Sequence, residues 1–229
     1  MKKEIIIYHG SENIIEQPKY GYGKIYNDYG LGFYCTEYEE LAKEWASSEQ
    51  HGGYANKYKL DLSNLKILDL NSKEYTVLHW IAILLKNRPV TLDTQISITA
   101  KEYILNNFLV NTEGYDIIIG YRADDSYFSF ARDFLQNSIS VNQLKQVLKL
   151  GELGNQIVLK SKMAFDQLSF ISYSEAPQQI YFPRRKNRDL LARHAYLSTK
   201  GDFQQFNADD ILMIDIIRGG ILENDPRLR

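Results

Sequence analysis

The chain has 229 residues and a net charge of −2, with 44% hydrophobic and 24% charged residues. This composition is typical of a folded protein with one substantial core. The net charge excludes an overall positive charge that would attract nucleic acid or anionic membranes. The single cysteine, Cys35, excludes an internal disulfide and fits a reducing compartment. The apolar run near the N-terminus is too short for a secretory or membrane segment, so we expect a cytoplasmic protein with no membrane partner.

The stretch 29–46 predicts a strand followed directly by a helix. Glycines alternate with aromatic and apolar residues up to Thr36, and apolar residues then recur on one helical face that ends at Trp45. Thr36 is the expected N-cap of this helix, with glutamates in the positively polarised first turn. Tyr34 from the strand and Trp45 from the helix are therefore expected to face the same space.

The remaining elements combine short strands with helices, which predicts an α+β fold. Strands are expected at 5–8, 54–60, 65–70, 116–119, 155–160 and 168–173. Helices are expected at 74–87, 95–110, 128–136 and 140–150, with a turn or short helix at 162–166 and further helix from 183 to 222. Because the chain becomes basic after Pro177, we expect one domain over 1–176 and a helical extension packed on it over 177–229.

Several common kinds of site are disfavoured by residue spacing. The glycine pairs lack the full fingerprint of dinucleotide-binding folds. The four histidines are scattered without the paired spacing of metal ligands, so no metal site is expected. Cys35 lies on the strand face opposite Tyr34, which favours a core position over a nucleophile paired with His9. The basic cluster from Arg184 to Arg193 is either a solvated helix face or a site that binds a phosphate-bearing acceptor.

Three strand-borne motifs occur in a fixed order. They are Tyr8-His9-Gly10-Ser11, then Gly32-Phe33-Tyr34-Cys35-Thr36 with the helix ending at Trp45, and then Asn155-Gln156-Ile157-Val158. This ordered set resembles the ADP-ribosyltransferase superfamily, in its His-Tyr-Glu branch. The segments H-G-S, D-Y-G-L-G-F-Y-C-T and Y-D-I-I-I-G-Y-R-A-D-D are most similar to the bacterial DUF3990 family, and the resemblance covers residues 5–173.

The resemblance implies a split antiparallel sheet with surrounding helices, and an NAD cleft between the halves of the sheet. It implies that His9 bonds a ribose hydroxyl of NAD, the co-substrate, and that the backbone of Gly10 holds the nicotinamide amide. It also implies that Tyr34 and Trp45 stack on the two faces of the nicotinamide ring. Aromatic faces attract a cationic pyridinium, which supports this arrangement on physical grounds. Two further residues would line the same cleft, namely Ser11 and Thr36.

The catalytic residues are where this chain departs from the family pattern. The resemblance places Gln156 where the best-known members carry a glutamate, and an amide orients a ribose hydroxyl without supplying charge. Asp124 or Asp125, in the loop after the strand at 116–119, is expected to supply a carboxylate, with Glu152 as another candidate. The expected catalytic set is therefore Gln156, His9, Asp125 and Asp124.

The function implied by the resemblance is an NAD-dependent mono-ADP-ribosyltransferase that acts as a bacterial toxin, effector or defence protein. Such an effector can be secreted without a signal peptide. The acceptor is open among protein, nucleic acid and small molecule, and an antitoxin partner is also open. Two alternatives remain: a non-catalytic module that binds NAD, ADP-ribose or a partner, and an NAD glycohydrolase that uses water as acceptor.

Overall fold

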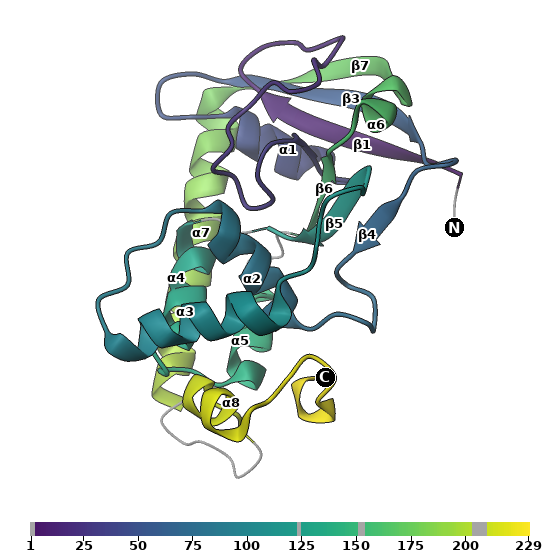
Figure 1. Cartoon of the computed structure of the whole chain (residues 1–229). Helices are drawn as coiled ribbons and strands as arrows, with labels where there is room; N and C mark the ends of the chain where they lie inside the picture. Colours follow the sequence, from purple (N-terminus) through teal and green to yellow (C-terminus); the bar gives the residue numbers. More distant parts are fainter. Residues whose placement is uncertain (1–2, 123–124, 151–153, 203–209) are drawn as a thin grey trace.

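The computed structural model describes residues 3–122, 125–150, 154–202 and 210–229 (Figure 1). Its first sheet contains β1 (Glu4–Ser11), β3 (Gly53–Asp61) and β7 (Leu168–Ala176), antiparallel in the order β1-β3-β7. Ile7, Tyr58 and Leu60 are fully buried on one face of this sheet, as the alternating pattern of a half-buried strand predicts.

The second sheet contains β2 (Phe33–Cys35), β4 (Ile67–Asp69), β5 (Ile117–Tyr121) and β6 (Asn155–Leu159), in the order β2-β6-β5-β4. β2 and β5 flank β6 and are antiparallel to it, but β4 is parallel to β5. The expectation of a purely antiparallel sheet is wrong at this edge. Two helices connect β4 to β5, and a long crossover of this kind returns the chain in a parallel direction.

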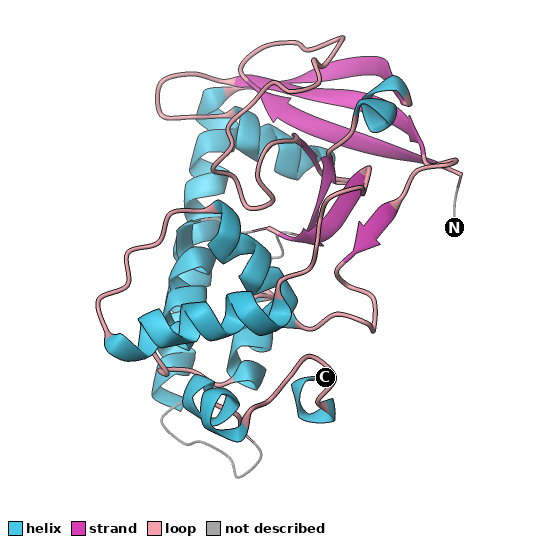
Figure 2. Ribbon diagram, in the orientation of Figure 1, coloured by secondary structure: helices cyan, strands magenta, loops and turns pink. Residues whose placement is uncertain are grey.

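One bridge joins the two sheets. The amide of Tyr8 in β1 donates to the carbonyl of Thr36 at 2.7 Å, and the amide of Thr36 donates back to Tyr8 at 2.9 Å. Beyond this point β1 pairs with β3 and β2 pairs with β6, so the strands form two separate groups (Figure 2). The chain therefore has the mixed α+β architecture that its sequence predicts, and His9 and Tyr34 both lie beside the bridge.

The lower half of the molecule in Figure 1 is helical. Its helices are α2 (Val77–Asn87), α3 (Gln95–Phe108), α4 (Asp125–Leu135), α5 (Val141–Val147) and α8 (Met213–Gly219). They surround a core that includes Trp80, Phe108, Phe130 and Phe134. Thr76, Thr94 and Ser140 cap α2, α3 and α5 through their side chains. Short segments α6 (Lys162–Asp166) and a 3₁₀ turn (Pro226–Leu228) complete the chain.

Helix α1 (Glu39–Ala46) packs closely on β1. A Cβ atom at Gly10 would lie 2.0 Å from the carbonyl oxygen of Ala42, so only glycine permits this approach. The prediction that Thr36 caps α1 is wrong, because the N-cap residue is Tyr38. The bridge to Tyr8 holds Thr36 in the strand, and its hydroxyl instead accepts from the amide of Tyr38 at 3.2 Å.

Helix α7 (Gln178–Asp202) runs from the first sheet down to the helical half (Figure 1). At its first turns Tyr181 packs with Ala46 and Ala176, and further along Tyr196 joins the helical core. Met213 and Ile216 of α8 are buried in the same core. The segment after residue 177 thus shares its hydrophobic contacts with both halves. None of the helices in the described ranges combines the length and apolar character needed to span a membrane.

Candidate functional site

A cleft of about 970 Å³ opens where α1, β6 and α7 meet the loop that precedes β2. The residues that line it come from distant parts of the sequence, and His9, Tyr34, Trp45 and Gln156 are among them. The fold therefore brings together four of the residues that the sequence nominated.

His9 is held in one orientation, and its burial favours the neutral ring. Its Nδ1 lies 2.7 Å from the carbonyl oxygen of Tyr34, and its ring stacks on Phe33 with the centroids 4.2 Å apart. Because a carbonyl only accepts, Nδ1 carries the proton. Burial lowers the pKa of His9, although the bond to the Tyr34 carbonyl opposes this shift. The neutral ring therefore leaves Nε2 as a hydrogen-bond acceptor on a residue that lines the cleft.

Tyr34 is fixed through its hydroxyl group. The hydroxyl donates to the carbonyl of Gly30 at 2.5 Å and accepts from the amide of Tyr29 at 3.1 Å. Burial raises the pKa of Tyr34, so the phenol remains protonated and can donate. Lys160 donates to the carbonyls of Tyr29 and Leu31, at 2.6 and 2.5 Å. These bonds hold the loop before β2 against the ring of Tyr34.

One face of Trp45 is covered by another side chain. The guanidinium carbon of Arg122, immediately after β5, lies 3.9 Å from the centre of the Trp45 ring, in cation–π contact. The indole Nε1 of Trp45 is buried and has no hydrogen-bond partner among the described residues. Both side chains line the cleft. A planar ligand can therefore stack on Trp45 only on its other face, or after Arg122 has moved.

Gln156 places a buried acceptor at the cleft. It lies on β6 opposite Gly120 and is 7% exposed. Its Oε1 has no hydrogen-bond partner in the described part of the chain. An unpaired buried carbonyl oxygen costs roughly 1–3 kcal/mol, which a hydroxyl donor on a bound ligand would offset.

The other nominated residues have different positions. Gly10, Ser11 and Thr36 are not among the residues that line the cleft. The Ser11 hydroxyl bonds the carbonyl of Asn13 at 2.5 Å and accepts from Asn56 at 3.0 Å. Gly10 and Thr36 instead serve the packing of α1 and the bridge between the sheets.

The aspartate candidates at the end of β5 stay predictions. Asp124 and Glu152 lie outside the described residues. Asp125 is the first residue of α4, and its side chain is not among those described.

Sequence reasoning missed most of the charged residues of the cleft. The described residues that line it include five cationic side chains, Lys19, Arg88, Arg122, Arg185 and Lys186. They also include three acidic side chains, Asp28, Glu49 and Asp189. Two of these acids are already paired, Asp28 with Arg88 at 3.2 Å and Asp189 with Arg193 at 2.8 Å. The cleft is thus cationic in a chain whose net charge is −2.

Two ion pairs seat α7 against α1. Glu44 is bound by Arg188 through two bonds of 2.8 and 2.9 Å, and its side chain is only 5% exposed. Glu40 pairs with Arg184 at 2.8 Å, and both of these side chains are more than half exposed. The two glutamates are four residues apart on α1, and the two arginines are four residues apart on α7. This matched spacing is the sequence signal that would have revealed the contact between the helices.

Comparison with known proteins places this α+β chain in a family. The sequence profile of a family described as "protein of unknown function (DUF3990)" matches residues 5–170. The match spans well over half of the chain, so the chain belongs to the DUF3990 family. No curated protein and no solved structure matches it. Helix α7, which forms one wall of the cleft, lies beyond the matched region.

Proposed function

We propose that the protein is an NAD-dependent mono-ADP-ribosyltransferase of the ADP-ribosyltransferase superfamily. The bond between the nicotinamide nitrogen and C1′ of the ribose breaks, and its electron pair leaves with neutral nicotinamide. An acceptor nucleophile then forms a bond to C1′ and gives up its proton. The transition state resembles an oxocarbenium ion, as in glycoside hydrolysis.

The observation that carries this proposal is the buried oxygen of Gln156. Its Oε1 has no partner among the described residues although the side chain is 7% exposed and lines the cleft. His9 lines the same cleft, and its neutral ring has Nε2 as an acceptor. A hydroxyl group donates one hydrogen bond, so the two hydroxyls of a ribose can donate one bond to each of these two acceptors.

The size and chemistry of the cleft support a dinucleotide. Its volume of about 970 Å³ lies near the upper end of the range of ligand pockets, roughly 300–1,000 Å³. The rings of Tyr34 and Trp45 suit a planar pyridinium. The excess of cationic side chains suits the two phosphates that join the nucleosides.

The amide at position 156 favours slow cleavage and one alternative function. Asp28 is the buried carboxylate among the described lining residues, and Arg88 offsets its charge at 3.2 Å. Glu49 also lines the cleft but is exposed to solvent, so the described part of the cleft offers acceptors without a buried, uncompensated negative charge for the oxocarbenium ion. This feature favours, as second candidate, a module that binds NAD or ADP-ribose without turnover.

Incubation with NAD labelled in its adenine half separates the candidates. We expect free nicotinamide, measured by chromatography, together with label on a macromolecular acceptor from a bacterial lysate. Nicotinamide with free ADP-ribose would instead identify an NAD glycohydrolase. Neither product, with measurable binding of ADP-ribose, would identify the binding module.

His9→Ala is the matched loss-of-function variant, and His194→Ala, on the exposed part of α7, is its control. A wild-type protein that releases no nicotinamide contradicts the proposed activity. A toxin or effector role further predicts that expression slows bacterial growth, and that His9→Ala relieves the effect while His194→Ala does not.

A further inference from the structure

Helix α7 presents two cationic side chains to the cleft. Arg185 and Lys186 line it together with Phe182. Neither cation forms an ion pair with a carboxylate in the described ranges, whereas the neighbouring Arg184 and Arg188 pair with glutamates of α1. The basic cluster is thus divided by face: two arginines pair with α1, where the buried pair of Arg188 holds the helix, and Arg185 and Lys186 line the cleft.

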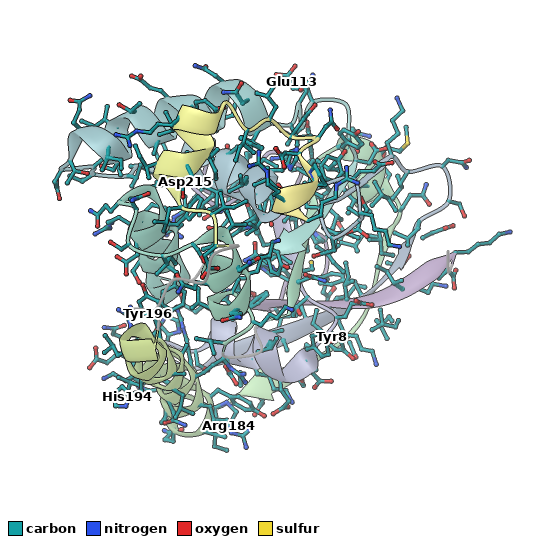
Figure 3. All side chains as sticks on the ribbon, turned by 90° about the horizontal axis from the view of Figure 1, so that it is seen from below. Tyr8, Glu113, Arg184, His194, Tyr196 and Asp215 are labelled. Carbon is teal, nitrogen blue, oxygen red and sulfur yellow. The ribbon has the colours of Figure 1, made fainter. Side chains whose placement is uncertain are left out.

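The position of Arg185 is set by the end of α1. Its guanidinium donates to the carbonyl of Ser47 at 3.2 Å, and Ser47 is the C-cap residue of α1. Trp45 lies two residues earlier and lines the same cleft. The buried pair between Glu44 and Arg188 fixes α7 in this register. Figure 3 labels Arg184, His194 and Tyr196 on α7, which is seen nearly end-on in this view.

Lys186 and Phe182 complete the group of side chains that α7 presents to the cleft. They are four residues apart on α7, and the Lys186 ammonium lies 5.6 Å from the centre of the Phe182 ring. A guanidinium binds phosphate oxygens through two parallel bonds, and an ammonium adds a point charge. An aromatic ring beside these cations supplies a stacking surface for a base.

We propose that Arg185 and Lys186 form a diphosphate subsite, which binds the two phosphates of a nucleotide whose ribose lies between His9 and Gln156. The inference rests on the proposed function for its ligand, NAD or ADP-ribose. It assigns to α7, beyond the region that defines the family, a direct part in binding that ligand.

The test is calorimetric titration of the full chain with ADP-ribose and with inorganic pyrophosphate. For the Arg185→Gln/Lys186→Gln variant we expect affinity for both probes to fall about 10-fold or more, since hydrogen bonds between charged groups contribute more than neutral ones. The control is Arg184→Gln/Arg218→Gln, which removes the same charge at exposed positions outside the cleft. Its affinities should stay within about twofold of wild type, because exposed ion pairs contribute little.

Lys186→Gln alone keeps the test valid if loss of the Arg185 bond to Ser47 disturbs α7, and its affinity should also fall. The subsite is refuted if the double variant binds both probes like the wild type, if the control loses as much, or if the wild type binds neither probe. A wild type that binds ADP-ribose through these residues without cleaving NAD refutes only the proposed activity. Cleavage of NAD with an unchanged KM in the double variant refutes only the subsite.

Discussion

The two walls of the cleft differ in how firmly their side chains are held. The wall from β1, β2 and β6 carries His9, Tyr34 and Gln156, which are largely buried, and the first two are bonded to backbone carbonyls. The wall from α7 carries Arg185 and Lys186, which are exposed and extend from a helix surface, although Arg185 also donates to the carbonyl of Ser47. Rigid groups set the geometry of a reacting centre, whereas long cations adapt to a charged ligand. The first wall should therefore control the rate and the second wall the affinity.

The largest effect should come from Arg188→Ala, which removes the support of the α7 wall. It leaves Glu44 buried without its bidentate partner, and breaking a buried pair costs about 3–5 kcal/mol of unfolding free energy. Arg184→Ala breaks an exposed pair on the same helix and should cost less than about 1 kcal/mol. Urea unfolding of both variants measures the difference. Equal losses would show that the burial of Glu44 does not decide how α7 is held.

His9→Ala tests whether the first wall controls the rate. We expect kcat/KM for NAD cleavage to fall about 100-fold or more, because a preorganised contact to the reacting sugar is lost. The affinity for pyrophosphate should be unchanged, because that probe lies on the α7 wall. Steady-state kinetics and calorimetry provide the two measurements. A variant with normal kcat/KM would remove His9 from the site.

Tyr34→Phe separates the ring from its hydroxyl. The ring remains for stacking, but the bonds to Gly30 and Tyr29 are lost, so the unfolding free energy should fall by about 1–2 kcal/mol. KM for NAD should rise by a smaller factor than in Tyr34→Ala, which also lacks the ring. Denaturant unfolding and kinetics of the two variants make the comparison. If both variants raise KM equally, the ring does not contribute to binding.

The smallest effect should be the pH dependence contributed by His9. Burial lowers its pKa in the folded protein, so below the unfolded value of about 6.5 the unfolded chain binds a proton that the folded protein excludes. The contribution of neutral His9 to stability is complete above this pH and is lost as the pH falls toward the folded pKa. Compared with His9→Gln, the wild type should lose more stability between pH 7 and pH 5.5 in urea unfolding. Parallel pH profiles would contradict this.

Much of the fold followed from local sequence patterns. Apolar alternation located most of β3 and β7, and helical periodicity located α2 and α3. The burial of Cys35 also followed from its position on the strand, opposite Tyr34. Non-local pairing decided the rest. The bridge to Tyr8 keeps Thr36 extended and moves the start of α1. The sequence around Thr36 contains no pattern that predicts this pairing with Tyr8.

For the site, too, local patterns identified some residues, and contacts between distant elements decided the others. His9, Tyr34, Trp45 and Gln156 were predicted because they stand in motifs on strands or on the helix that follows one. Arg122 lies within the segment Y-D-I-I-I-G-Y-R-A-D-D, yet its contact with Trp45 depends on how β5 lies relative to α1. Arg185 and Lys186 belonged to a basic stretch, and the sequence alone did not tell which cations face α1 and which face the cleft. The ion pairs between α1 and α7 determine which cations face α1 and which face the cleft.

The central claim is that one cleft binds NAD between a rigid wall and an adaptable wall. A crystal structure of the Gln156→Ala variant, which should bind NAD but cleave it slowly, tests this claim most directly. The account predicts the nicotinamide ring beside Tyr34, a ribose hydroxyl on Nε2 of His9, and the phosphates at Arg185 and Lys186. A nicotinamide ring bound away from Tyr34 and Trp45 would contradict it.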